Sequence, residues 1–317
     1  MSAFAPFRRI AIIGFGLIGS SVARSCRKLG LAQELVCIDR DPAVRARVAE
    51  LGLCDSIFSD AAKGVAGCDQ VILCVPVMAN AALAATIGPH LEPGTIVSDV
   101  GSVKGCVVRD VGPHLPPGVA FVPAHPVAGT EHSGPDAGFA ELFQNRWCIL
   151  TPPTETDPTA IQRIRAFWEA MGANVEVMTP DHHDRVLAIT SHLPHLIAYN
   201  IVGTADDMEK VTQSEVIKFS AGGFRDFTRI AASDPTMWRD VFLTNKDAVL
   251  EMLGRFSEDL LALQRMIRWG DRDGLHALFT RARTIRRGII AQGQESPAPD
   301  FGRTNAPTPP AKATDAQ

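Results

Sequence analysis

The sequence has little net charge of either sign, and this argues against two classes of partner. Its 35 acidic and 31 basic residues leave a formal charge of −4 over 317 residues. Proteins that bind nucleic acid or an anionic membrane surface through charge carry a basic excess, usually gathered in one patch. We therefore expect a small-molecule partner, with no nucleic acid and no membrane.

The sequence also lacks paired cysteines. None of its seven cysteines forms a Cys-x-x-Cys pair or has a spacing typical of zinc ligands. An odd number of cysteines without such spacing is typical of reduced, mostly buried thiols. These observations favour a cytoplasmic protein.

Two apolar stretches resemble targeting or membrane segments but are interrupted. Arg8-Arg9 and the apolar run after them imitate a signal peptide, yet glycines follow at a spacing typical of a phosphate-binding loop. Val186–Ala205 has no formal charge, but it contains residues that are costly in hydrocarbon: His192, Pro194, His195 and Asn200. We expect this second stretch to be a buried helix.

Short apolar runs alternate with helical segments from Arg9 to about Leu150, which predicts βαβ units in a parallel sheet. Crossover helices are expected at Leu17–Leu29 and Asp41–Leu51. A helix over Pro158–Met171 and a strand over Asn174–Met178 would end this domain. The other predicted strands are Ile10–Ile13, Leu35–Ile38, Gln70–Val75, Thr95–Asp99, Val119–Pro123 and Trp147–Leu150.

The character of the chain changes near residue 180, where helical periodicity replaces the strand-like runs. We expect a dinucleotide-binding domain over 1–180 and a helical domain over 181–291, which the 46% apolar content can supply with cores. Pro235–Trp269 has the spacing of one long amphipathic helix, whose apolar face would pack against a second copy or within the chain. Residues 292–317 hold five prolines and few large apolar side chains, which predicts a disordered tail with no regulatory domain after it.

A glycine fingerprint opens the first predicted helix. Gly14, Gly16 and Gly19 follow an apolar strand, and Asp39 comes 20 residues after the last of them. These glycines permit a tight turn, close approach of a pyrophosphate, and close packing of helix on strand, while Leu17 and Ile18 begin the helix whose N-terminus attracts phosphate. The pattern predicts a Rossmann-type, doubly wound sheet that binds a dinucleotide.

Asp39 indicates which dinucleotide is bound. A carboxylate at the end of the second strand accepts hydrogen bonds from ribose hydroxyls and repels a 2′-phosphate, which favours NAD over NADP. The neighbouring Arg40 leaves NADP open, because a guanidinium can pair with that phosphate or stack on adenine.

Several residues follow the later strands, where loops of an open sheet reach the ligand crevice and polar side chains are candidates for chemistry. They include Val75, Pro76, Asp99, Ser102 and His125. A dehydrogenase that oxidises an alcohol needs a base with a pKa near neutrality, and His125 is the candidate. Taken alone, a histidine after a strand is more often structural.

Two segments of the helical domain are rich in polar groups, 191–195 and 222–231. Arg229 in the second is suited to binding a substrate carboxylate. Both segments are also compatible with capped helices and structural histidines. A metal site is not favoured, because no thiolate or carboxylate set accompanies the available imidazoles of His182, His183, His192 and His195.

Four segments together resemble the prephenate and arogenate (cyclohexadienyl) dehydrogenases. They are Gly14–Gly19, Asp99–Lys104, His125–Gly134, and Ser191–His195 with Gly222–Ala231. The resemblance runs from about Arg9 to Ile290. It implies a Rossmann domain followed by an all-α dimerisation domain, a homodimer, and oxidative decarboxylation of prephenate or arogenate, or both, in tyrosine biosynthesis.

The resemblance also implies roles for individual residues. His125 would accept the hydroxyl proton, and Ser102 would orient the hydroxyl or the imidazole. Arg225, Asp226 and Trp238 would form a supporting shell. Substrate contacts are expected at Arg229, His195, His192, Glu131 and Gly222, and cofactor contacts at Gly14, Gly16, Leu17, Ile18, Gly19, Asp39, Arg40, Val75, Pro76, Asp99 and Ser102.

Two other functions stay open. A β-hydroxyacid dehydrogenase or imine reductase also joins a Rossmann domain to a helical one, but the Gly-x-x-x-Lys pattern expected of that class is missing from 181–205. A nicotinamide-sensing protein without turnover is the non-catalytic alternative, since a fold alone does not establish function.

Overall fold

The computed structural model describes residues 4–130, 132–212 and 217–291. The chain divides into two compact units, 1–253 and 254–317. The predicted tail, 292–317, lies outside the described residues.

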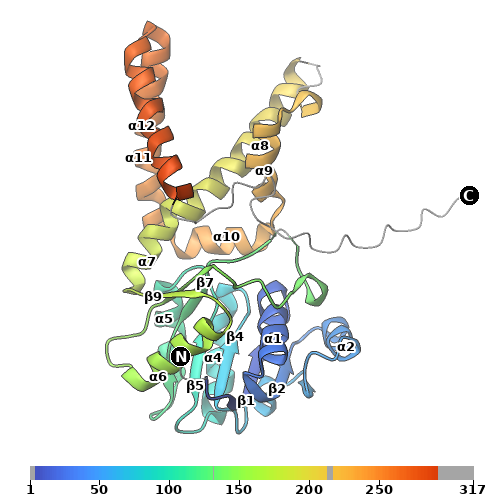
Figure 1. Cartoon of the computed structure of the whole chain (residues 1–317). Helices are drawn as coiled ribbons and strands as arrows, with labels where there is room; N and C mark the ends of the chain where they lie inside the picture. Colours follow the sequence, from blue (N-terminus) through green and yellow to red (C-terminus); the bar gives the residue numbers. More distant parts are fainter. Residues whose placement is uncertain (1–3, 131, 213–216, 292–317) are drawn as a thin grey trace, which may run out of the picture. The chain divides into compact units, whose positions relative to one another are not determined.

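The first unit is built on a six-stranded parallel sheet in the order β3-β2-β1-β4-β5-β6 (Figure 1). This order is that of the Rossmann fold and confirms the predicted fold class. Its strands are β1 (Phe7–Ile13), β2 (Ala32–Ile38), β3 (Ser56–Phe58), β4 (Gln70–Leu73), β5 (Ile96–Asp99) and β6 (Ala120–Phe121). Sequence patterning missed β3 because three residues are too few to show a period.

Alternate residues of β1 serve opposite faces of the sheet, as the twofold period of a strand requires. Ile10 and Ile12 join a core with Phe167 and Trp168, whereas Ala11 and Ile13 join a second core with Val107. Both faces are therefore covered, which is why the strands read as continuous apolar runs.

Helices connect the strands of this sheet. Helix α1 spans Leu17–Leu29, as predicted, and α2 spans Pro42–Glu50. The Asp41 side chain accepts a hydrogen bond from the Ala43 N–H and so caps α2, whose first residue is Pro42. The remaining crossover helices are α3 (Ala61–Gly64), α4 (Asn80–Ile87) and α5 (Gly105–Val111).

A second, three-stranded sheet contains β7 (Ala124–Pro126), β8 (Trp147–Leu150) and β9 (Asn174–Val177). Strands β8 and β9 are parallel and are joined by α6 (Pro158–Ala170), whereas β7 runs antiparallel to β8. The prediction that Trp147–Leu150 continues the parallel sheet was therefore wrong. The order of strands in space depends on long-range pairing that local patterning does not contain.

The described residues between 180 and 244 are mostly helical. Their helical elements are α7 (Pro180–Leu187), a π-helical turn η5 (Ala188–His192), α8 (Leu193–Thr212), a 3₁₀ turn η6 (Ile217–Phe219), α9 (Gly222–Thr228), a 3₁₀ turn η7 (Arg229–Ala232) and α10 (Pro235–Thr244). By length and composition, Pro180–Lys210 could cross a membrane, and 28% of its most apolar window is buried. The expected buried helix, Val186–Ala205, is thus only partly buried, although it carries the fully buried His192.

The single helix predicted over Pro235–Trp269 was also wrong. The structure has two helices, α10 and α11 (Lys246–Trp269), separated at Asn245. Asn245 is 6% exposed, and its side-chain amide donates a hydrogen bond to the Asp184 carbonyl oxygen at 2.8 Å. A buried tertiary hydrogen bond at this residue accompanies the break between the two helices. The spacing of apolar residues cannot predict such a long-range hydrogen bond.

The second unit begins within α11 and continues into α12 (Arg272–Ala291) after a turn at Gly270, whose φ is +69°. No residue between 254 and 289 is buried. Large apolar side chains stay exposed there, among them Leu260, Leu261, Ile267, Trp269, Phe279 and Ile285. So much exposed apolar surface in one unit is typical of an interaction surface.

Candidate active site

The glycine loop lies at the carboxyl end of β1. Gly14 has φ +94°, and a Cβ atom there would lie 2.5 Å from the Cys74 carbonyl oxygen. A Cβ atom at Gly19 would lie 2.0 Å from the Gly14 carbonyl oxygen. The fold itself therefore requires glycine at these two positions.

Gly16 differs from the other two, because no atom lies within 4 Å of a Cβ atom built on it. It is the N-cap of α1, and no side chain caps the helix there. Leu17 and Ile18, both half-buried, form the first turn. The open space and the uncapped N–H groups fit a pyrophosphate, since helix N-termini attract phosphate.

Asp39 follows β2 and is tied to this loop. Its Oδ2 atom accepts a hydrogen bond from the Phe15 N–H, and its Oδ1 atom accepts one from the Asp41 N–H, each at 2.9 Å. A carboxylate has about four acceptor positions, so it retains capacity for ribose hydroxyls. Arg40 is exposed. Arg45 donates to the Asp39 and Arg40 carbonyl oxygens at 2.8 and 2.9 Å.

The loop after β4 lies against the glycine turn. A Cβ atom at Gly14 would come within 3.2 Å of Val75 Cγ1, and Val75 is half-buried while Pro76 is exposed. Both residues therefore lie at the carboxyl edge of the sheet, where the sequence predicted cofactor contacts.

Asp99 has a different environment from the one expected of a cofactor contact. Its side chain is 0% exposed, forms an ion pair with the fully buried Lys104, and accepts a hydrogen bond from the Gly101 N–H at 2.7 Å. It also accepts from the Ala124 N–H at 3.3 Å, which ties β5 to β7. The Asp99 carboxylate is therefore enclosed and joins these strands, and the cofactor contact expected at Asp99 stays a prediction.

His125 lies on β7 and is 6% exposed. Its Nδ1 atom is 2.8 Å from Nε2 of His183. Burial is the main reason that the pKa of His125 lies well below its usual value, and the charges of His183 and Lys104 lower it further. The ring is therefore neutral at pH 7. Its other nitrogen, Nε2, has no hydrogen-bond partner among the described residues and is not fully enclosed.

His183 and Asp184 complete this cluster from the first turn of α7. His183 Nδ1 lies 2.8 Å from Asp184 Oδ1. The Asp184 carboxylate also accepts hydrogen bonds from the backbone N–H groups of Lys104 and Gly105, both at 2.8 Å. Sequence reasoning considered His183 only as a metal ligand and missed Asp184, because 58 residues separate His183 from His125.

His192 is fully buried and is oriented by Asn245. The Asn245 amide nitrogen donates to the Asp184 carbonyl oxygen, and it lies 3.1 Å from Nδ1 of His192. The Asp184 carbonyl oxygen can only accept a hydrogen bond, so the Asn245 side chain must direct its NH2 group toward it. The same NH2 group faces Nδ1 of His192, so Nδ1 accepts and Nε2 carries the proton. Burial lowers the pKa of His192 to about 4. Its Nε2 finds no hydrogen-bond acceptor within the described part of the chain.

His195 and Arg229 lie close to each other. Burial lowers the pKa of His195, and the charge of Arg229 lowers it further. The His195 ring stacks on Trp238 with centroids 3.6 Å apart, and its Nδ1 lies 2.9 Å from the Ser191 carbonyl oxygen. Trp238 therefore supports His195, as the predicted aromatic shell requires. Arg225 and Asp226 are exposed on α9.

The other predicted site residues have plainer surroundings. Ser102 is half-buried, and within the described ranges its hydroxyl makes no hydrogen bond to His125. The Ser102 backbone lies near His192 and acts to raise the pKa of that histidine, against the larger effect of burial. Gly222 is exposed at the start of α9. Glu131 lies outside the described residues. No group of three metal-binding side chains occurs among residues 4–130, 132–212 and 217–291.

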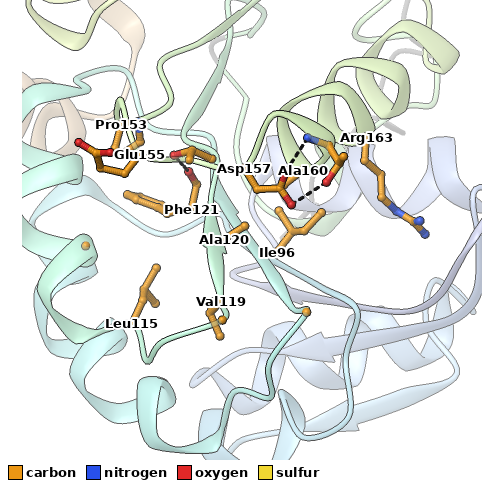
Figure 2. Close-up of a pocket in the computed structure, with 15 residues that line it drawn as sticks. Ile96, Leu115, Val119, Ala120, Phe121, Pro153, Glu155, Asp157, Ala160 and Arg163 are labelled. Carbon is orange, nitrogen blue, oxygen red and sulfur yellow. Dashed lines mark hydrogen bonds between the residues drawn. The ribbon is translucent and has the colours of Figure 1, made fainter.

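A pocket of about 890 Å³, drawn in Figure 2, has none of the residues of this cluster in its lining. Its lining includes Ile96 and Ala120 at the amino ends of β5 and β6, together with Glu155 and Arg163. Asp157 in this pocket caps α6 by accepting from the Thr159 N–H. Ligands of open α/β sheets bind at the carboxyl ends of the strands, so we assign no catalytic role to this pocket.

Comparison with known proteins gives a consistent result. Residues 22–177 match the family model described as prephenate dehydrogenase, nucleotide-binding domain, and residues 179–281 match the one described as prephenate dehydrogenase, dimerization domain. The glycine loop precedes the first matched residue, so its interpretation rests on the geometry above.

Three relatives are informative. The chain is 44% identical to a cyclohexadienyl dehydrogenase of Zymomonas mobilis, over 89% of this chain and 96% of that one. A prephenate dehydrogenase from Aquifex aeolicus, solved with hydroxyphenyl propionate and NAD+, superimposes with a TM-score of 0.84 at 34% identity, over 90% of this chain and 99% of that one. Arogenate dehydrogenase from Synechocystis superimposes with a TM-score of 0.74 at 28% identity, over 89% and 99% of the two chains.

Proposed function

This chain belongs to the prephenate dehydrogenase family, and on that basis we propose that it oxidises and decarboxylates prephenate or arogenate with NAD, in tyrosine biosynthesis. The observation that carries the proposal is the neutral, buried His125 with its bare Nε2, on strand β7, which the hydrogen bond from the Ala124 N–H to Asp99 ties to the carboxyl end of β5. A base of this kind is what alcohol oxidation requires.

The dinucleotide would be held by the glycine loop and Asp39. Gly16 leaves space for the pyrophosphate, the first turn of α1 supplies N–H donors, and the Asp39 carboxylate would accept from the adenosine ribose and repel a 2′-phosphate. NAD is therefore preferred to NADP. Bound NAD supplies the acceptor for the hydride that leaves the substrate carbon.

The residues of this chain would handle the proton and the carboxylate. His125 Nε2 accepts the proton of the ring hydroxyl, and Ser102 orients that hydroxyl. Arg229 binds a substrate carboxylate, with His195 beside it and the His192 Nε2–H as a further donor. Gly222 and Glu131 would line the region of the side chain. The remaining carboxylate departs as carbon dioxide, and the ring becomes aromatic.

The direct test is to mix the protein with NAD and then with prephenate or arogenate, and to follow absorbance of the reduced cofactor. His125→Asn should lower kcat by about 10²–10⁴-fold and leave NAD affinity unchanged, because a positioned base is lost. Arg229→Ala should raise KM strongly. No signal with either substrate, but turnover of a 3-hydroxy acid, would favour the β-hydroxyacid dehydrogenase alternative instead.

A homodimer is part of the same proposal. The region over 179–281 matches a dimerization domain, and the second unit exposes many large apolar side chains. Sedimentation should give twice the chain mass, and Phe279→Asp with Ile285→Asp should shift it toward the monomer. A monomeric native protein at micromolar concentration would contradict this part.

The free cysteines agree with a cytoplasmic site of action.

A further inference from the structure

The catalytic histidine of the proposed reaction touches a second histidine. The rings of His125 and His183 meet edge to face, with centroids 5.0 Å apart, and Nδ1 of the first lies 2.8 Å from Nε2 of the second. One of these two nitrogens must carry a proton and the other must accept it, because two bare nitrogens or two N–H groups would repel.

The direction of this hydrogen bond follows from Asp184. Its carboxylate receives the backbone N–H groups of Lys104 and Gly105, and Nδ1 of His183 lies 2.8 Å from its Oδ1 atom. An ionised carboxylate only accepts, so His183 Nδ1 carries the proton. Burial lowers the pKa of His183, so its ring is neutral at pH 7 and its Nε2 is bare.

A bare His183 Nε2 accepts from His125 Nδ1, and a neutral His125 then has its lone pair on Nε2. We propose that His183 and Asp184 are positioning residues of the reaction: together they hold His125 in the tautomer whose Nε2 is free to take the substrate proton. This inference rests on the proposed function, because the tautomer of His125 affects turnover only if His125 is the base of that reaction.

The proton balance of the step is simple. The O–H bond of the substrate would break as an N–H bond forms at His125 Nε2, and the freed electron pair would form a C=O bond as the carbon that bears the hydroxyl loses its hydride. Bound NAD would supply the acceptor of that hydride. The protons on His125 Nδ1 and His183 Nδ1 stay where they are. The imidazolium formed on His125 then donates through His183 toward the Asp184 carboxylate, which stabilises its charge.

Other charged and titratable groups face this chain of contacts from several elements. Lys104 at the start of α5 disfavours a proton on both rings, Asp99 on β5 favours one on His183, and His192 in η5 disfavours one on His125. Among the described residues, only Asp184 accepts a hydrogen bond from His183 Nδ1, which is why the tautomer of His183 depends on it.

The test compares three substitutions in the 317-residue chain. His183→Leu keeps the volume but neither accepts nor donates, and should lower kcat about 10- to 100-fold with KM and NAD affinity unchanged. His183→Gln can place an acceptor near the former Nε2 and should recover most of the lost kcat. His182→Leu, at the exposed neighbouring histidine, is the matched control and should leave kcat unchanged.

A spectroscopic readout separates positioning from a structural role. In ¹⁵N-labelled protein, His125 should give the pattern of a bare Nε2 and a protonated Nδ1, and this pattern should be lost in His183→Leu. If that variant does not fold, His183→Asn, too short to reach His125, replaces it in the comparison with His183→Gln.

The outcomes distinguish the two proposals. Native kcat in His183→Leu, or equal losses in the Leu and Gln variants, would overturn the positioning role while His125→Asn still tests the base. In contrast, full turnover of His125→Asn, or no turnover of either cyclohexadienol by the native protein, would overturn the proposed function itself.

Discussion

Alanine at Gly16 and alanine at Gly19 should damage this protein in different ways. At Gly19 the added methyl group would lie 2.0 Å from the Gly14 carbonyl oxygen, a backbone atom that cannot move alone. Overpacking of this kind costs about 1–3 kcal/mol. Each kcal/mol lowers the Tm of a domain of this size by roughly 2–4 °C. Gly19→Ala should therefore lose stability without any cofactor present.

At Gly16 the same methyl group meets no atom within 4 Å, and the backbone there has φ −75°, which alanine adopts easily. The gain from a less flexible unfolded chain, about 0.4–1 kcal/mol, is offset because alanine is a poor N-cap residue. The Tm of the apo protein should stay nearly unchanged. The methyl group would fill the space proposed for the pyrophosphate, so NAD affinity should fall by at least about tenfold, or about 1.4 kcal/mol.

Thermal unfolding without NAD and calorimetric titration with NAD measure the two effects separately. Gly112→Ala, another position where a Cβ atom meets nothing within 4 Å, serves as a control far from the loop. Wild-type NAD affinity in Gly16→Ala would refute the assignment of this space to the pyrophosphate. An unchanged Tm in Gly19→Ala would refute the close approach of α1 to the glycine turn.

Three further predictions concern the buried polar groups. Lys104→Met should lower the free energy of unfolding by about 3–5 kcal/mol, measured by urea unfolding, because Asp99 would stay buried without its ion partner; a smaller loss in the Lys104→Met/Asp99→Asn double variant would support this cause. The free energy of unfolding should fall as pH drops from about 6.5 to about 4, because the pKa of His192 is lowered to about 4 in the fold and the unfolded chain takes up the proton first. His192→Gln should therefore flatten the dependence of Tm on pH. The same slope in the variant and the native protein would contradict this prediction. Asn245→Ala should destabilise by about 1–3 kcal/mol, because the Asp184 carbonyl oxygen and His192 Nδ1 lose their donor, and should raise KM; the exposed Asn200→Ala should do neither.

Much of the first unit could be predicted from local sequence. The bounds of α1 agree residue for residue, and β1, β2, β4, β5 and β6 each overlap a predicted strand. Apolar periodicity, a capping aspartate before proline, and glycines at fixed spacing are all local signals. They identify elements well when those elements are long or buried on both faces.

The same signals could not predict how distant elements combine. Strand β8 has an ordinary apolar pattern, yet it pairs with β7 and β9 rather than with the parallel sheet. Apolar spacing predicted one helix where Asn245 makes a break, because the hydrogen bond from Asn245 to Asp184 joins residues 61 positions apart. Asp99 follows a strand like the other crevice residues, but its carboxylate turns inward to Lys104.

The fold class, the glycine loop and the candidate base could be predicted from local sequence, because each depends on residue types at short, fixed spacing. The groups that surround that base come together only through tertiary packing. His183 and Asp184 are close to each other in the sequence but far from His125, and nothing in their spacing connects them to it. Hydrogen bonds across 58 residues arise from the packing of α7 against β7 and the start of α5, and they determine which nitrogen of His125 is free.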